Sequence, residues 1–189
     1  MEALLTSALV VALAEIGDKT QLLAILLATR FKRPWPIIAG IFAATLANHA
    51  LAALVGSEVA ALIDAHWFRY AIAISFIIMA VWTLVPDSDE GLDKPGRRAG
   101  AFVTTLIAFF IVEMGDKTQI ATVALAAQFR TLLWVTVGTT IGMMIANVPA
   151  VLLGEAVLRR VPMTAIRIVA AASFLVLGVW MLAQTAAIL

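Results

Sequence analysis

The chain contains no cysteine, and it contains few charged residues. Without cysteine, disulfides, thiolate nucleophiles and cysteine metal sites are excluded. Asp, Glu, Lys and Arg make up 13% of the 189 residues, whereas 63% are hydrophobic. Because soluble domains typically have about 25% charged residues, this composition predicts an integral membrane protein. A net charge of +1, without a basic face, indicates no nucleic-acid partner.

Long apolar runs, in contrast, are abundant. A helix needs about 20 predominantly apolar residues to cross a hydrocarbon core of about 30 Å. Six segments are long enough, at about residues 3–29, 35–62, 68–86, 101–127, 132–158 and 164–188. The sequence therefore predicts an all-α membrane protein with six transmembrane helices in the lipid bilayer.

One extended polar segment, 87–100, divides the chain into two halves, 1–86 and 101–189. An offset of 98 residues aligns the halves without a gap and places Gly40 opposite Gly138. Because three spans are an odd number, the second copy must enter the membrane from the opposite side. We therefore expect two inverted-topology three-helix repeats joined by a charged linker, an architecture typical of transporters.

Basic residues in the short loops predict the orientation. Nine of them fall on the side of the linker: Arg30, Lys32, Arg33, Lys94, Arg97, Arg98, Arg159, Arg160 and Arg167. Two, Arg69 and Arg130, fall on the other side. The linker is therefore predicted to be cytoplasmic, with both termini outside.

The same charged motif occurs in the first span of each half. It reads Glu-Ile-Gly-Asp-Lys-Thr at 15–20 and Glu-Met-Gly-Asp-Lys-Thr at 113–118. On a continuous helix, Glu15, Asp18 and Lys19 would share one face. An ionisable group in the middle of a span costs about 2.5 to 3.5 kcal/mol. Repeating such costly charges predicts a functional site shared by the two halves.

The charges of the motif predict a divalent-cation site. Each copy has two acids and one lysine, so the two copies together have a charge of −2 when fully ionised. The expected metal ligands are Glu15, Asp18, Glu113 and Asp116. Further candidates for a cation or proton site are Thr20, Gln21, Thr118, Gln119, Lys19, Lys117, Asn48 and Asn147. The carboxylate, hydroxyl and amide oxygens among these residues suit Mn²⁺, Ca²⁺ or Mg²⁺.

Two glycines in the motif, Gly17 and Gly115, are expected to loosen the helix and turn backbone carbonyls toward the ion. Without the cation, desolvation and like-charge repulsion favour the protonated form of the carboxyl groups. Metal and protons then compete for the same acids, which is the physical basis of an antiporter. His49 could relay protons or be a hydrogen-bonded packing residue, and Asn48 and Asn147 could also serve as interhelical hydrogen-bonding residues.

The duplicated Glu-x-Gly-Asp-Lys-Thr motif resembles the signature of the Golgi-type manganese/calcium-proton antiporter family, which has Golgi, chloroplast and bacterial members. The resemblance covers all six predicted spans and the linker. It implies that the four signature acids bind the transported cation, and that the chain exports manganese as its compact bacterial relatives do. The chain lacks the N-terminal extension of organellar members, which implies a bacterial inner (plasma) membrane.

The signature does not separate Mn²⁺ from Ca²⁺. No cofactor besides the transported ion is expected, and the sequence leaves open whether the chain forms a homo-oligomer.

Three other interpretations remain open from the sequence. The Glu and Lys of each motif could form i, i+4 salt bridges that merely let a charged helix insert. The same acids could line a passive divalent-cation channel, with flux independent of a proton gradient. Asp18 and Asp116 could form the dyad of an intramembrane aspartyl protease, although Glu stands where those proteases have the first Gly of Gly-x-Gly-Asp. We expect a transporter rather than an enzyme.

Overall fold

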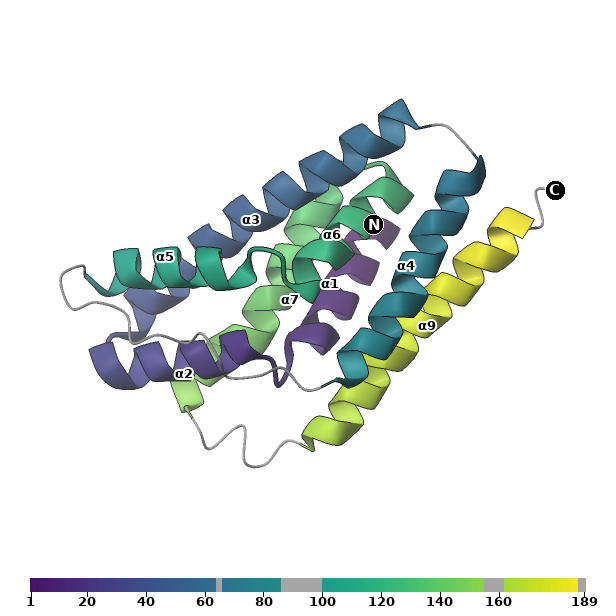
Figure 1. Ribbon diagram of the computed structural model, residues 1–189. Coiled ribbons are helices and arrows are strands. Elements are labelled where there is room, and N and C mark those ends of the chain that lie inside the picture. The colour runs from purple at the N-terminus through teal and green to yellow at the C-terminus, as the bar shows by residue number, and fades with distance from the viewer. Residues whose placement is uncertain (64–65, 86–99, 155–161, 187–189) are drawn as a thin grey trace.

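The computed structural model describes residues 1–63, 66–85, 100–154 and 162–186. Over these residues it has no strand and eight helices (Figure 1): α1 (Glu2–Glu15), α2 (Lys19–Phe31), α3 (Pro34–Leu62), α4 (His66–Leu84), α5 (Ala101–Glu113), α6 (Lys117–Phe129), α7 (Leu132–Leu153) and α9 (Met163–Ala186). The all-helical prediction is confirmed for this part of the chain. The predicted linker, apart from Gly100, lies outside the described residues, as do Lys94, Arg97, Arg98, Arg159 and Arg160.

Four of the described helices are long and apolar enough to cross a membrane, namely α3, α4, α7 and α9 from Thr164 onward. The other two predicted spans are divided. Segment 3–29 contains α1 and α2, and segment 101–127 contains α5 and α6. Each of these four helices has only 13 or 14 residues, which is too short to cross the hydrocarbon core alone. These two segments are therefore not the single helices that the hydropathy predicted.

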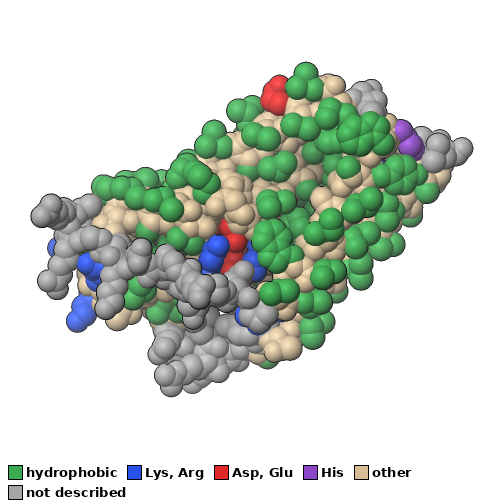
Figure 2. Space-filling model, in the orientation of Figure 1, with side chains coloured by type: hydrophobic (Ala, Val, Ile, Leu, Met, Phe, Trp, Pro, Cys, Tyr) green, Lys and Arg blue, Asp and Glu red, His purple; other side chains and the backbone are tan. Residues whose placement is uncertain are grey.

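Hydrophobic side chains cover much of the outer surface (Figure 2). Trp35, Ile111 and Val176, on three different helices, are 74%, 64% and 66% exposed. A soluble monomer rarely exposes large contiguous apolar patches. Such a surface is suited to contact with lipid.

The two halves pack together through α1 with α7 and through α3 with α5 and α6. Glycines allow the backbones to approach closely. A Cβ added at Gly40 would lie 2.8 Å from the carbonyl oxygen of Phe102, and one added at Gly138 would lie 2.5 Å from that of Leu4. Gly138 is the counterpart of Gly40 at the offset of 98 residues, and Phe102 is the counterpart of Leu4. The same close contact between the halves therefore occurs twice.

The helices α4 and α9 form a separate pair. Their contact includes Phe76 and Phe174, whose ring centroids are 6.2 Å apart. This pair packs against α6 and α1, whereas α2 and α5 lie on the opposite side of the bundle (Figure 1). We call the end where α3, α6 and α9 finish the terminal end, because it also holds the N-terminus (Figure 1). At the opposite end α2, α4 and α7 finish.

Candidate functional site

Each charged motif lies at a break between two helices. In the first half, α1 ends at Glu15 and α2 begins at Lys19. In the second half, α5 ends at Glu113 and α6 begins at Lys117. The expectation that the charged residues share one face of a continuous helix is therefore wrong. The glutamate closes one helix, and the aspartate is the N-cap of the next.

Glycine is required at each break because the backbone adopts a positive φ there. Gly17 has φ 85° and Gly115 has φ 80°, a region that costs other L-residues about 1 to 2 kcal/mol. The chain can therefore turn between the two helices without strain. As a result, the C-terminus of one helix and the N-terminus of the next point into the same region of the protein in both halves.

The motif glutamines stabilise these breaks. Gln21 Oε1 accepts a hydrogen bond of 2.9 Å from the backbone N–H of Gly17, and Gln119 Oε1 accepts one of 2.6 Å from Gly115. Their Nε2 groups donate across the interface between the halves, to the carbonyl of Ala146 and to Asn48 Oδ1, each at 2.9 Å. Both glutamines were candidates for the cation or proton site. Here they cap the helix breaks and link them to the neighbouring helix.

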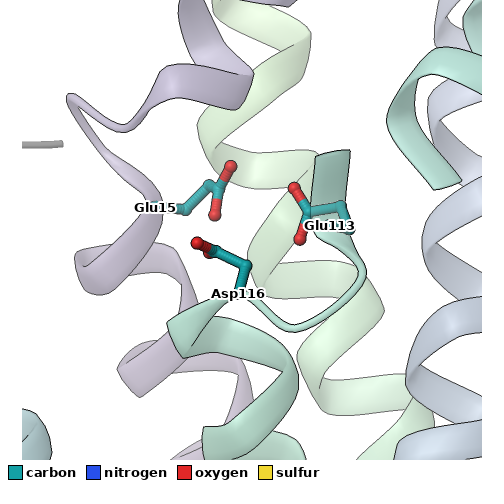
Figure 3. Close-up of side chains that lie close together, drawn as sticks. All are labelled: Glu15, Glu113 and Asp116. Carbon is teal, nitrogen blue, oxygen red and sulfur yellow. The ribbon is translucent and has the colours of Figure 1, made fainter. Parts of the chain in front are cut away.

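Three of the four signature acids lie close together (Figure 3). Glu15, Glu113 and Asp116 each offer a carboxylate oxygen, and these oxygens lie within 4.8 Å of one another. All three side chains are buried. Glu15 comes from the first half of the chain and the other two from the second, so the cluster exists only because the halves meet.

The fourth acid, Asp18, is also buried but belongs to an ion pair rather than to this cluster. Its Oδ1 lies 3.7 Å from Lys117 Nζ, and Asp116 Oδ1 lies 3.1 Å from Lys19 Nζ. Each motif lysine thus forms an ion pair with the aspartate of the other half. The i, i+4 geometry considered from the sequence requires a continuous helix, whereas the helix is interrupted between the glutamate and the lysine of each motif.

The ion pairs also bear on the protease interpretation. A catalytic dyad needs two aspartates that share a proton. Here Asp18 and Asp116 each face a lysine, and the group of clustered acids includes Asp116 without Asp18. This geometry does not favour a dyad.

Two further candidates contact the acids directly. The hydroxyl of Thr118 lies 3.1 Å from Glu113 Oε2 and 3.4 Å from Asp116 Oδ2. Asn147 Nδ2 donates to Glu15 Oε1 at 3.3 Å. Thr20 and Asn48, the corresponding candidates, form no such hydrogen bond to an acid in the described part of the chain. Thr20 is buried, and its hydroxyl has no hydrogen bond within the described chain. Asn48 donates to the carbonyl of Phe110 at 3.0 Å and accepts from Gln119 Nε2 at 2.9 Å, so neither of these partners is an acid.

His49 lies at the position that corresponds to Asn147. It is fully buried, and neither ring nitrogen has a hydrogen bond among the residues described. The hydrogen bond expected of a packing histidine is therefore not found within the described part of the chain.

Arg167 is a neighbour of the site that the sequence did not identify, because it was counted only as a basic residue near a loop. It lines a cavity of about 10 Å³ together with Asp18, Lys117 and Thr83, enough for about one water molecule. The available signal was the offset of 98 residues, which pairs Arg167 with Arg69. Arg69, however, lies at the terminal end, so only the structure could place one of this pair beside the acids.

The arrangement is suited to binding a cation. Glu15 Oε2, Glu113 Oε1 and Asn147 Oδ1 are buried acceptors without a hydrogen-bond donor in the described chain. A buried carboxylate needs a compensating charge or a proton. The C-termini of α1 and α5 place negative dipole ends beside the glutamates, and the N-termini of α2 and α6 place positive ends beside the aspartates. Carboxylate and amide oxygens are ligands for Mn²⁺, Ca²⁺ and Mg²⁺.

Comparison with known proteins agrees with this chemistry. The family described as "Divalent cation/proton antiporter GDT1" matches residues 3–91 and 101–188. A Vibrio cholerae protein with the printed name "Putative manganese exporter" is 51% identical over 179 residues, covering 94% of this chain and 89% of that protein. A GDT1-like protein of Synechocystis is 29% identical over 81% of this chain and 83% of its own length. GDT1-like protein 5 of Arabidopsis thaliana is 25% identical over 88% of this chain and 89% of its own length. No solved structure matches the chain.

Proposed function

Because the chain belongs to the GDT1 family of divalent cation/proton antiporters, we propose that it exports Mn²⁺ from the cytoplasm in exchange for protons. The family resemblance and the divalent cation/proton exchange predicted from the motif are both confirmed by this membership. The choice of Mn²⁺ is supported by the similarity to the Vibrio cholerae protein and by the oxygen donors of the site. Ca²⁺ is the competing cargo.

The observation that carries the proposal is the cluster of Glu15, Glu113 and Asp116. Their carboxylate oxygens come within 4.8 Å of one another in a buried site. With Asp18 and the two motif lysines, the two motifs have a charge of −2 when ionised, which one divalent cation neutralises. Protons can neutralise the same acids when the cation leaves. A single set of groups thus alternates between the two substrates.

The proposed architecture is two inverted three-helix repeats, in which α1 with α2, and α5 with α6, each cross the membrane as one broken span. The reciprocal Lys–Asp pairs support it. So do the matching contacts of Gly40 and Gly138. Broken helices whose ends face a central site are typical of secondary transporters.

We assign the cytoplasmic side of an inner membrane to the end opposite the terminal end. Arg30, Lys32 and Arg33 lie there, at the end of α2 and the start of α3, and basic residues favour the cytoplasmic side. The small cavity beside Asp18 is lined by Thr83, in the last turn of α4, and by Arg167, near the start of α9. Both helix ends belong to this side.

Access to the site is supported by the exposure of one motif lysine. The Lys19 side chain is 26% exposed, whereas that of Lys117 is 4% exposed. Basic and acidic side chains are visible together at the middle of the face in Figure 2. In the proposed cycle, Mn²⁺ enters, takes the aspartate oxygens from the lysines and displaces protons from the glutamates.

The proton gradient drives the return step. If two protons exchange for one Mn²⁺, the cycle is electroneutral, and each pH unit contributes about 1.4 kcal/mol per proton. More protons per cycle would let the membrane potential contribute about 2.3 kcal/mol per charge per 100 mV.

Purified protein in liposomes with an internal Mn²⁺-sensitive dye tests the proposal. Mn²⁺ flux should require an opposing pH gradient, and Glu15→Gln with Glu113→Gln should abolish it. Glu58→Gln is the matched control, because Glu58 is exposed near the end of α3. Flux without a pH gradient would instead indicate a channel, and undiminished flux in the double variant would refute the site. The same assay with Ca²⁺ decides between the two cargoes.

A further inference from the structure

A second polar cavity, far from the acids in the fold, lies at the terminal end between α3, α4, α6 and α9. It has a volume of about 320 Å³ and is lined by Arg69 and Arg130, with Gln128, Gln184 and Thr185. No acid is among its described lining residues. Two guanidinium groups with the side-chain amides of Gln128 and Gln184 form a cavity suited to an anionic group such as a phosphate. The Thr185 hydroxyl donates instead to the carbonyl of Met181 at 2.8 Å.

An apolar groove of about 230 Å³ continues from this cavity toward the middle of the protein. The two share Phe68, Ile72 and Ala127 as lining residues. The floor of the groove is α6, between α3 and α4 (Figure 1). Ser75 of α4 also lines the groove. Its hydroxyl donates to the carbonyl of Ile72 at 2.7 Å, so the groove stays apolar. We call the cavity and the groove together the arginine cleft.

The dimensions of the arginine cleft match one leaflet of a bilayer. From Arg130 to Ile120, which lines the groove, ten residues of α6 rise about 15 Å. This is half of a hydrocarbon core of about 30 Å. Trp67, which precedes the lining residue Phe68 at the start of α4, is 62% exposed, as expected of an aromatic residue at the membrane interface. The arginines therefore lie at headgroup level and the groove at acyl-chain level.

We propose that the arginine cleft binds one anionic phospholipid, with its phosphate between Arg69 and Arg130 and one acyl chain in the groove. A soluble anion would use the cavity alone and would leave the adjoining apolar groove unexplained. A zwitterionic lipid would fill the groove but would bring a cationic group beside the two arginines, which repel it. The site is independent of which cation the protein transports.

Native mass spectrometry of the full-length protein in mild detergent tests this site. The protein is offered equal amounts of phosphatidylglycerol and phosphatidylcholine with identical acyl chains. We expect one tightly held phosphatidylglycerol, preferred about 25-fold, because each arginine near the surface contributes about fivefold, or about 1 kcal/mol. Arg69→Gln and Arg130→Gln should each reduce the preference about fivefold, and together they should abolish it.

Two further variants separate the headgroup from the chain. Ala71 is exposed and lines the groove, so Ala71→Phe should fill the groove and reduce retention of both lipids. Lys32→Gln is the matched control for Arg130→Gln, because both residues end a helix in the left-handed conformation, with φ 53° and 50°. It should leave the preference unchanged, and size-exclusion elution checks the fold of every variant.

Three results would overturn the proposal. The first is an unchanged lipid preference in the folded double arginine variant. The second is complete displacement of phosphatidylglycerol by inorganic phosphate, which would show that the groove contributes nothing. The third is a set of several equally weak lipids in place of one, which would mean nonspecific contact around the helices.

Discussion

Lys19 Nζ lies 3.1 Å from Asp116 Oδ1, so the lysine of the first motif forms an ion pair with the aspartate of the second. The reciprocal pair, Lys117 with Asp18, is longer at 3.7 Å and more deeply buried. The two motifs have nearly the same sequence but unequal surroundings. Comparing the same substitution in the two motifs therefore separates the effect of the residue type from the effect of its surroundings.

Lys117→Gln should destabilise the protein more than Lys19→Gln. Removing one partner of a buried pair leaves an uncompensated charge and costs about 3 to 5 kcal/mol. Water that reaches the partly exposed Lys19 should screen the charge left on Asp116, so the cost of Lys19→Gln should be smaller. The Lys117 side chain is 4% exposed and that of Lys19 is 26% exposed. Thermal unfolding in detergent measures the difference. Equal losses of stability would show that burial does not distinguish the two pairs.

Gly115→Ala should cost about 1 to 2 kcal/mol, because Gly115 has φ 80° and alanine disfavours this conformation. Steric contact is not involved, since a Cβ added there meets nothing within 4 Å. Gly100→Ala is the control. A Cβ at Gly100 also meets nothing, and its φ is −64°. If both variants unfold at the same temperature, the break does not need a left-handed residue.

Gln21→Leu should lower stability by about 0.5 to 2 kcal/mol, the usual cost of losing a helix cap. The substitution removes the acceptor for the Gly17 N–H and the donor to Ala146. Gln119→Leu should have a similar effect through Gly115. A direct role in binding the cation would give a different result, namely weaker Mn²⁺ binding at an unchanged unfolding temperature.

Glu113→Gln should weaken Mn²⁺ binding more than about 100-fold, because loss of an outer-shell partner of a metal ligand already costs about 10- to 100-fold. Asp116→Asn should be more severe than Asp18→Asn, since Asp116 belongs to the acid cluster and Asp18 does not. Titration of the purified protein with Mn²⁺ measures these affinities, with Glu58→Gln as control. If Asp18→Asn weakens Mn²⁺ binding more than Asp116→Asn does, the ion binds beside Asp18 rather than beside Asp116.

Mn²⁺ affinity should increase with pH, because the metal binds carboxylates only after their protons leave. Each proton released per ion changes the apparent Kd about tenfold per pH unit. Two protons therefore predict a change of about 100-fold, and one proton predicts about tenfold. Measuring Kd at several pH values below neutrality gives the stoichiometry directly. An affinity independent of pH would exclude direct competition between Mn²⁺ and protons.

The motif acids and the antiporter family could be recognised from the sequence because charge in an apolar span is costly and conspicuous. The roles of Gln21 and Gln119 could not. A glutamine beside two acids has the chemistry of a ligand, and only the positive φ of the neighbouring glycine shows which backbone N–H it caps. Arg167 was missed for a related reason, since its neighbours belong to other helices.

The sequence by itself determined the apolar composition, the duplication and the pair of charged motifs, because these depend only on which residues stand where along the chain. The tertiary structure decided which of those charges meet. Glu15 joins Glu113 and Asp116, while each lysine crosses to the aspartate of the other half. The physical reason is that the glycine breaks redirect the chain within each motif. Neighbours in sequence are thereby separated, and groups about 100 residues apart share one buried site.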